Sequence, residues 1–245
     1  MRETKRATSE LRTRTRLVDA ATRLFSERGF RRVTVRQICR AARANVAAVN
    51  YHFGDKMGLY REVLQRATDV MQATTDAART AGANKPPEER LRTFIAAFLE
   101  RLQGTAESLA DERERHLRHT WLHRLIEMEI ADPTPALDTI VDRGVRPRID
   151  YVSGIIAEIL NCSPTDPRVL RCVGSIQSQC LMARPNPIAA RLMASGSGAE
   201  AIRGLTDHIT AFSLAGIRAV RSQAVDESSR TSERPRRPPG RRSRR

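Results

Sequence analysis

The stretch ARANVAAVNYHF, from Ala42 to Phe53, combines small apolar side chains with groups that can contact DNA. An asparagine can bond bidentately to adenine, alanine methyls can touch the thymine methyl group, and a tyrosine hydroxyl can donate to a phosphate. If the stretch is helical, with Val46 and Val49 turned inward, its other face is slim enough for a major groove about 12 Å wide. The residues predicted on that face are Ala47, Ala48, Asn50, Tyr51 and His52.

Positive charge gathers at the two ends of the 245-residue chain. Residues 1–56 hold 14 lysines and arginines against 5 acidic residues, residues 224–245 hold 8 against 3, and the part between is close to neutral. A basic first quarter on a near-neutral body is typical of a nucleic-acid-binding head joined to a domain with another task. A membrane surface or an acidic protein is a less favoured partner. The alternative is that the arginines reflect only a compositional bias and serve no binding function. The flanking arginines predicted to contact phosphates include Arg36 and Arg43.

Three histidines in the body could in principle bind a metal. His116, His119 and His123 fall on one helical stripe, and Glu127 follows four residues after the last of them. A stripe without a second cluster favours solvent-facing or hydrogen-bonded histidines, so we predict no metal and no cofactor. The sequence also contains no glycine-rich phosphate loop, no Gly-x-Ser-x-Gly and no His-Glu-x-x-His motif, and these absences argue against an enzyme.

Helices must position these residues, and the composition favours an all-α fold, because aromatic residues make up only 4% of the chain and β-branched residues form no alternating runs. Thr34 with Gln37 forms a capping box, and Asn45 and Asp55 are good N-caps. Helices are predicted over residues 13–28, 35–42, 45–53, 55–81, 88–103, 108–131, 135–160, 166–182 and 199–222. Two short helices that follow a longer one and are joined by about three residues are a helix-turn-helix.

The run TVRQICRAARANVAAVNYHFGDKMGLY, from Thr34 to Tyr60, resembles the DNA-binding domain of the tetracycline-repressor (TetR) family. The likeness extends over roughly residues 12–64. It implies phosphate contacts at Thr34, Tyr51 and Lys56, and base-edge contacts at Ala47, Ala48 and Asn50.

One position departs from the family pattern. Where the turn commonly reads Ala-Gly-Val, this chain reads Ala42-Arg43-Ala44. A residue in that turn commonly takes positive φ, so Arg43 should cost stability. We expect that it is kept because its guanidinium can contact a phosphate beside Asn45, where the N-terminus of the next helix favours an anion.

The body contains the run RLIEMEIADPTPALDTIVDRGVRPR, from Arg124 to Arg148, and is similar to the C-terminal domain of the CecR or CerR branch of the same family. Members of this branch repress transport and drug-tolerance genes, which implies a ligand-responsive homodimeric repressor that binds a palindromic double-stranded DNA operator. The family pairs its last two long helices across the dimer, which implies an interface of Val169, Val173, Ile176, Ile202, Leu205, Ile209, Phe212 and Ile217. The remaining helices would enclose a pocket for an unknown small-molecule effector, with Phe94, Phe98, Trp121, Leu125 and Met128 as candidate lining residues. An ordinary core is the alternative for both sets.

These elements divide the chain into a basic N-terminal arm at residues 1–12, a helix-turn-helix domain at 13–62, an effector-binding and dimerisation domain at 63–223, and a disordered arginine- and proline-rich tail at 224–245. The tail either adds non-specific phosphate contacts or only aids solubility. No apolar run is long enough to span a membrane, and we expect a cytoplasmic protein. The rival to a sequence-specific regulator is an architectural or non-specific nucleic-acid-binding protein without effector response.

Overall fold

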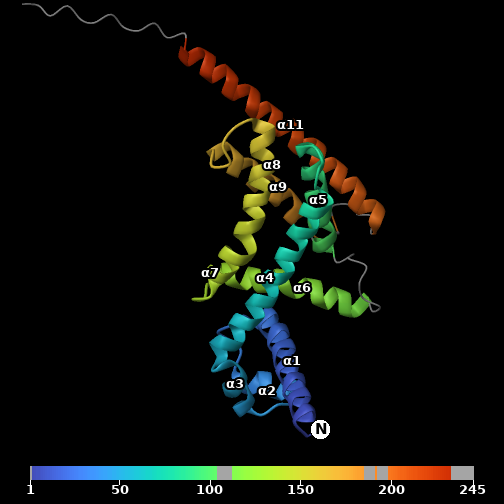
Figure 1. Ribbon diagram of the computed structural model, residues 1–245, viewed down its shortest axis with the longest axis vertical. Helices are drawn as coiled ribbons and strands as arrows, with labels where there is room; N and C mark the ends of the chain where they lie inside the picture. The colour runs from blue at the N-terminus through green and yellow to red at the C-terminus, as the bar shows by residue number, and fades with distance from the viewer. Residues whose placement is uncertain (1, 104–111, 185–190, 192–197, 233–245) are drawn as a thin grey trace, which may run out of the picture.

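The computed structural model confirms the predicted all-α fold (Figure 1). It describes residues 2–103, 112–184, 191 and 198–232, and the side chains of residues 8–103, 121–184, 191 and 198–223. All the regular secondary structure within these ranges is helical.

The first four helices are α1 (Arg2–Arg28), α2 (Val35–Ala42), α3 (Val46–Phe53) and α4 (Lys56–Ala81). They are followed by α5 (Pro87–Gln103), α6 (Glu112–Ala131), α7 (Leu137–Ile140), the π-helix η1 (Val141–Val145), α8 (Arg146–Leu160), α9 (Pro167–Met182) and α11 (Ala199–Ser232). In Figure 1, α1, α2 and α3 lie together at one end of an elongated molecule, and α5, α8, α9 and α11 lie towards the other. The long helix α4 connects the two ends.

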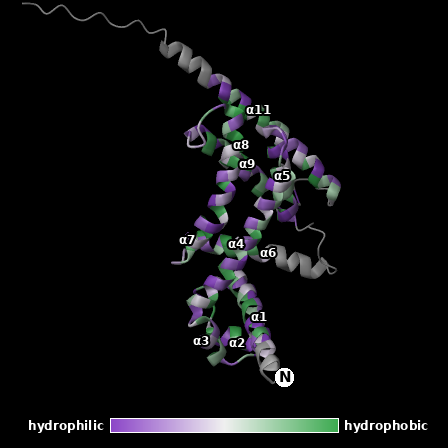
Figure 2. Ribbon diagram, viewed as in Figure 1, coloured by the Kyte–Doolittle hydropathy of each residue, from purple (hydrophilic) through white to green (hydrophobic). Residues whose placement is uncertain are grey.

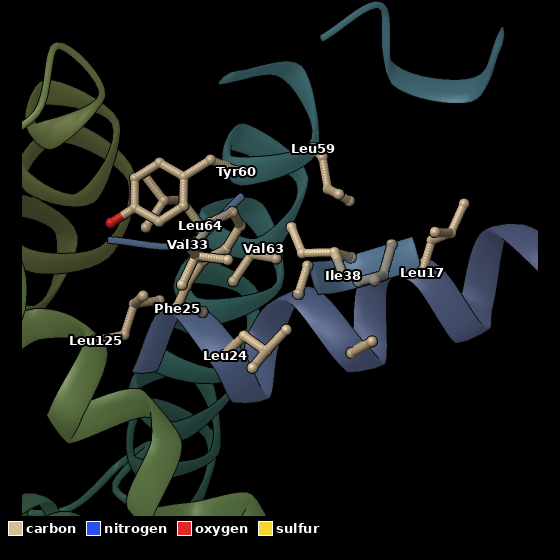
Figure 3. Packing of buried hydrophobic residues seen from close by; sticks show 14 of the residues in the cluster. Leu17, Leu24, Phe25, Val33, Ile38, Leu59, Tyr60, Val63, Leu64 and Leu125 are labelled. Carbon is tan, nitrogen blue, oxygen red and sulfur yellow. The ribbon is translucent and has the colours of Figure 1, made fainter. Parts of the chain in front are cut away.

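The end formed by α1, α2 and α3 has its own hydrophobic core. Phe25 of α1, Ile38 of α2, Val49 of α3 and Leu64 of α4 are fully buried in it. Burying one such side chain contributes about 1.5–3 kcal/mol. Leu125 of α6 reaches the same core, as Figure 3 shows, so the helix-turn-helix rests against α6 as well as against α4.

A second core joins α5, α8, α9 and α11. Phe94, Ile155, Val173 and Ile209 are buried in it, one from each of these helices. Figure 2 shows hydrophobic residues interspersed with hydrophilic ones along these helices, as expected for helices with one buried face. None of the helices in the described part of the chain combines the length and the apolar character needed to traverse a lipid bilayer.

The helices α1 and α11 are longer than the sequence analysis predicts. α1 begins at Arg2 instead of residue 13, and α11 ends at Ser232 instead of residue 222. Neither extension contains a glycine or a proline that would stop a helix, and most of their residues are compatible with helical structure. The predicted arm is therefore helical from residue 2 onward, and residues 224–232 of the predicted tail belong to α11. The rest of the predicted tail, residues 233–245, lies outside the described residues.

The helix predicted over residues 135–160 is interrupted by η1, where the chain packs closely on α4. A side chain at Gly144 would place its Cβ 2.8 Å from the Met71 sulfur and 3.2 Å from the Thr68 methyl carbon, so a larger residue there would require the Met71 side chain to shift. The Gln72 side chain donates to the Arg143 carbonyl at 2.8 Å. A π turn disturbs the regular backbone ladder, and this side chain satisfies one of the carbonyls in it.

Candidate nucleic-acid interface

Helices α2 and α3 both begin at the N-caps that the sequence predicts. The Thr34 hydroxyl accepts from the Gln37 amide at 3.3 Å, and the Thr34 amide donates to the Gln37 side chain at 2.8 Å, which completes the capping box. The Asn45 side chain accepts from the Ala47 amide at 3.0 Å. These local bonds fix where the two short helices start.

The turn between α2 and α3 contains the left-handed residue that the sequence analysis expects. Arg43 has φ 50° and ψ 49°. Its amide donates to the Arg40 carbonyl at 3.3 Å, and the Ala44 amide donates to the Cys39 carbonyl at 2.9 Å, which are the two bonds of a Schellman motif. Glycine is preferred at this position because a Cβ is strained there. The Arg43 side chain is exposed, two residues before the N-cap of α3.

Arg43→Gly should raise the free energy of unfolding by a few tenths to about 1 kcal/mol, because relief of strain outweighs the extra freedom that glycine gives the unfolded chain. Denaturant unfolding measures this change. If the guanidinium contacts a phosphate, the same substitution also weakens binding to every DNA sequence and reduces the salt dependence. Arg43→Ala is the matched control, since it removes the guanidinium but keeps Cβ, and it should lose DNA affinity without gaining stability. A glycine variant less stable than the wild type would contradict the strain argument.

The outward face of α3 exposes three of the five residues predicted on it. Ala47, Asn50 and Tyr51 are exposed, and Tyr51 has 74% of its surface accessible. Ala48 is half-buried and packs against the first core. His52 is also half-buried, with its ring edge-to-face against Tyr51 at 4.9 Å between centroids. The accessible face is therefore narrower than predicted.

The prediction that Val46 points inward is wrong. Val46 is 41% exposed, whereas Val49 is fully buried as expected. Val46 is the first residue of α3 and lies one turn before Asn50, so the two share an outward stripe. Its methyl groups could contact thymine beside the base that Asn50 faces.

The residues predicted to contact phosphates differ in how accessible they are around this face. Thr34, Arg36 and Asn45 are exposed at or near the starts of α2 and α3. Lys56, at the start of α4, is half-buried, and its Nζ lies 4.2 Å from the centre of the Phe30 ring. Burial lowers the pKa of Lys56. A cation–π contact of this kind orients the ammonium group and shortens its reach towards DNA.

A buried carboxylate connects α6 to the helix-turn-helix. Glu129, only 1% exposed, accepts a short hydrogen bond from the Tyr60 hydroxyl of α4. The amide and hydroxyl of Thr134 donate to the other carboxylate oxygen at 3.1 and 3.2 Å. Burial, together with the hydrogen bond and charge of Glu129, raises the pKa of Tyr60 well above its usual value. Arg31, in the loop after α1, pairs with Asp132 at 2.9 Å, so the end of α6 is attached to two parts of the DNA-binding unit.

The structure does not bring together the five residues predicted to line an effector pocket. Phe94 and Phe98 stack at 5.7 Å in the second core. Leu125 is buried in the first core, and Trp121 packs against that core. Met128 approaches the end of α1, where its sulfur lies 3.5 Å from the position of a Cβ on Gly29. The set divides because successive turns of α6 face the helix-turn-helix, not α5.

Most of the residues predicted at a dimer interface are buried inside a single chain. The six that belong fully to the second core are Val169, Val173, Ile176, Ile202, Ile209 and Ile217. Leu205 is half-buried against the same core. The most apolar stripes of α9 and α11 therefore face α5, α8 and each other within the chain, and an interface through these residues stays a prediction. Phe212 is the exception, since it is 64% exposed and lines a groove of about 390 Å³ between α9 and α11.

The outward faces of α9 and α11 carry small residues and a few large apolar ones among charged and polar side chains. The small exposed residues include Gly174, Ser175 and Ser178 on α9, and Gly204, Ala211, Ala215, Gly216 and Ala219 on α11. The large exposed ones are Leu170, Leu181, Met182 and Phe212. Small side chains allow another helix to approach closely, and a hydropathy pattern does not reveal them because they are weakly hydrophobic.

Of the three histidines in the stripe, one has a described side chain. The side chains of His116 and His119 lie outside the described residues, and His123 is buried. Across the described side chains, no group of three or more histidines, cysteines or acids could hold a metal ion.

Two family models match the chain. Residues 17–63 match the model for bacterial regulatory proteins of the tetR family, which covers the region from α1 to α4. Residues 87–217 match the model for the C-terminal domain of the HTH-type transcriptional dual regulator CecR. This second match spans more than half of the chain.

Known proteins resemble the chain over different lengths. CecR of Shigella flexneri is 25% identical over 159 residues, which are 63% of this chain and 67% of that protein. The HTH-type transcriptional repressor DhaR of Mycobacterium sp. (strain GP1) is 33% identical over 91 residues, 37% of this chain, and the match spans only 46% of its own length. The crystal structure of AibR in complex with isovaleryl coenzyme A and operator DNA shares the fold, with a TM-score of 0.56 and 17% identity over 82% of this chain and 97% of that one.

Proposed function

Since the chain belongs to the TetR family of bacterial regulatory proteins and carries a CecR-type C-terminal domain, we propose that it is a ligand-responsive homodimeric repressor of transport or drug-tolerance genes. The family is one of DNA-binding transcriptional regulators and not of enzymes. Its members bind operator DNA and small-molecule effectors, as the AibR complex illustrates. To these family properties we add dimer formation, repression as the direction of regulation, and transport or drug-tolerance genes as the targets.

The observation that carries the proposal is the outward face of α3. Ala47 and Asn50 are exposed on a short helix whose start is fixed by Asn45, and Val46 extends the same surface. Because these side chains are small, the helix backbone can come close to the base edges in a major groove. We assign base contacts to these three exposed residues and a phosphate contact to Tyr51 at the end of the face.

The phosphate contacts at the margin of this surface are assigned to Thr34, Arg36 and Arg43. All three are exposed, Thr34 and Arg36 at the start of α2 and Arg43 in the turn that follows it. Such contacts set the register and orientation of the protein on the duplex but do not choose a sequence. Lys56 is assigned a weaker role, because its ammonium group is held over Phe30.

The dimer is supported by the outward faces of α9 and α11. Phe212 is 64% exposed beside exposed glycines and alanines, in a groove whose lining also contains polar side chains such as Gln179. A two-fold axis there would present two copies of α3 to successive major grooves, and the operator would then be a palindrome.

The two hydrophobic cores correspond to two parts of the chain with different proposed functions. We assign DNA binding to residues 13–62, and effector binding and dimerisation to residues 63–223. The hydrogen bond between Tyr60 and Glu129 and the ion pair between Arg31 and Asp132 join these parts, so a change in the position of α6 would reach the helix-turn-helix.

Recovery of bound DNA across the genome of the source organism tests the proposal directly. We expect a few promoters that share a palindrome, and their genes name the regulated process. Binding spread evenly over the genome, with no common sequence, would instead identify a non-specific or architectural DNA-binding protein.

Asn50→Ala should weaken binding to the recovered operator by about 1–3 kcal/mol and leave binding to random DNA nearly unchanged, as expected for a base-edge contact. Titrations of both DNAs at several salt concentrations measure the effect. Tyr51→Phe is the matched control, because loss of a phosphate contact should weaken binding to both DNAs alike. Equal losses of Asn50→Ala on operator and random DNA would move Asn50 to the phosphate-contacting group.

A further inference from the structure

Two arginines lie beside one aromatic ring in the second core. Arg101 of α5 is only 8% exposed, and its Cζ lies 4.9 Å from the centre of the Phe98 ring. Arg148 of α8 is half-buried, and its Cζ lies 5.0 Å from the same centre. The ring face offers each guanidinium a partial electrostatic compensation.

No described carboxylate neutralises this pair. None of the ion pairs among the described residues involves Arg101 or Arg148. Burial, with the charge of Arg148 acting in the same direction, lowers the pKa of Arg101 to about 9, and burial lowers the pKa of Arg148 to about 10. Both therefore stay cationic near neutral pH. Burial raises the pKa of the neighbouring Cys180 thiol to about 12, so this group supplies no negative charge.

Hydrogen-bond donors beside the pair also lack acceptors. Arg148 Nη2 donates to Gln177 Oε1 at 3.3 Å. The Arg148 Nε and Gln177 Nε2 groups are buried, yet no described atom accepts a hydrogen bond from them. A buried charge or a buried hydrogen-bond donor without a partner lowers the stability of the fold. An acceptor that carries negative charge would satisfy both the guanidinium groups and the unpaired donors.

We propose that Arg101, Arg148 and Gln177 bind the anionic group of the effector, a carboxylate or a phosphate of a small organic acid. The proposal rests on the proposed function, because it places a ligand in the effector-binding part of the chain. Guanidinium groups bind both kinds of oxyanion through charge-assisted, often bidentate hydrogen bonds. Access is from the Arg148 side, because this arginine is the more exposed of the two.

The test uses the full-length protein without DNA, at constant ionic strength. The probes are benzoate for a carboxylate, phenyl phosphate for a phosphate, and benzyl alcohol as the neutral analogue. At ten times its Kd, the preferred anion should raise the melting temperature by about 3–6 °C, whereas benzyl alcohol should not. The ratio of the benzoate and phenyl phosphate affinities identifies the natural headgroup.

Arg148→Gln and Arg101→Met should each weaken binding of the preferred anion by about tenfold or more, as measured by calorimetric titration. Circular dichroism checks that both variants fold. Arg101→Met should remain folded, because replacing a buried charge that has no counter-ion by an apolar side chain of similar length is well tolerated. Arg92→Gln is the matched control, since Arg92 is an exposed arginine of α5 that pairs with Asp207 at 2.6 Å, and it should bind the anion as the wild type does.

Three results would overturn the site. They are no binding of either anion up to about 10 mM, equal affinity for benzyl alcohol, and unchanged anion affinity in both folded variants. A failure of the proposed function looks different. If the anion binds through these arginines but does not alter operator affinity, the site stands and the ligand-responsive part of the proposed function fails.

Discussion

Tyr60→Phe should lower the free energy of unfolding by about 1.5–3 kcal/mol at pH 7, the range for a hydrogen bond to a charged group. The substitution removes the hydroxyl that donates to Glu129. It retains the ring, which packs edge-to-face on Phe25 at 4.9 Å and lies 4.7 Å from Phe30. The carboxylate is then left buried with only Thr134 as a donor. Denaturant unfolding followed by circular dichroism measures the loss.

Tyr151→Phe is the matched control for this substitution. The Tyr151 hydroxyl is half-buried and donates to the Ala78 carbonyl at a longer distance, 3.4 Å. Its removal should cost less than about 1 kcal/mol. Equal losses in the two variants would mean that the Glu129 contact contributes nothing special, and that α4 and α6 are held together by apolar packing alone.

The Tyr60 hydroxyl also predicts how stability changes at alkaline pH. Its pKa is raised in the folded state above the ordinary value of 10.0, so above pH 10 the unfolded chain loses a proton that the folded chain keeps. The contribution of Tyr60 is therefore fully present below pH 10 and falls by about 1.4 kcal/mol per pH unit above it. Between pH 10 and 11 the stability difference between wild type and Tyr60→Phe should shrink. A constant difference over that range would contradict the assignment.

The parts of the site that depend on local chemistry could be predicted from the sequence. The capping box of Thr34 and Gln37, the Asn45 cap and the left-handed Arg43 all involve bonds between residues two to five positions apart. Such bonds need only the right residue types at the right spacing. Val46 was misplaced because a helix of eight residues has too few turns for its apolar positions to define one face.

Positions that depend on long-range packing could not be predicted in the same way. Hydropathy identifies the most apolar stripe of α9, but both a core and a dimer interface favour such a stripe, and here Val173 and Ile176 belong to the core. The small residues on the other face, such as Gly174, are the better indication of an unpartnered helix surface. Similarly, Trp121 and Phe98 are both apolar residues of the C-terminal part, yet α6 turns the first towards the helix-turn-helix.

The sequence does contain one indication of the arginine pair. Phe94, Phe98 and Arg101 occupy positions i, i+4 and i+7 of α5, so they lie on one stripe that the two phenylalanines mark as buried. An arginine on such a stripe must either reach solvent or enter the core with a partner. Only the structure shows that Arg148 arrives at the same ring from α8, because no local pattern connects two residues so far apart in the sequence.

Phe212→Asp should convert the protein from a dimer to a monomer at micromolar concentration and weaken operator binding by about a hundredfold or more. Aromatic side chains at interface centres contribute 2 kcal/mol or more to association, and a buried carboxylate in the same place adds a desolvation cost. In a two-fold interface each substitution occurs twice, so the loss is doubled. A single copy of α3 can then engage only one half-site of a palindrome. Sedimentation measures the mass, and titration with the operator measures the affinity.

The control for this substitution is Ile130→Asp, which places the same charge on an isoleucine of α6 that is already 72% exposed. It should remain dimeric, because the surfaces of α9 and α11 are unchanged. If Phe212→Asp is folded and still dimeric, the interface does not lie on the groove between these two helices. If the wild type itself sediments as a monomer at micromolar concentration, the exposed glycines and alanines of α11 do not form a dimer contact, and the palindromic operator loses its structural basis.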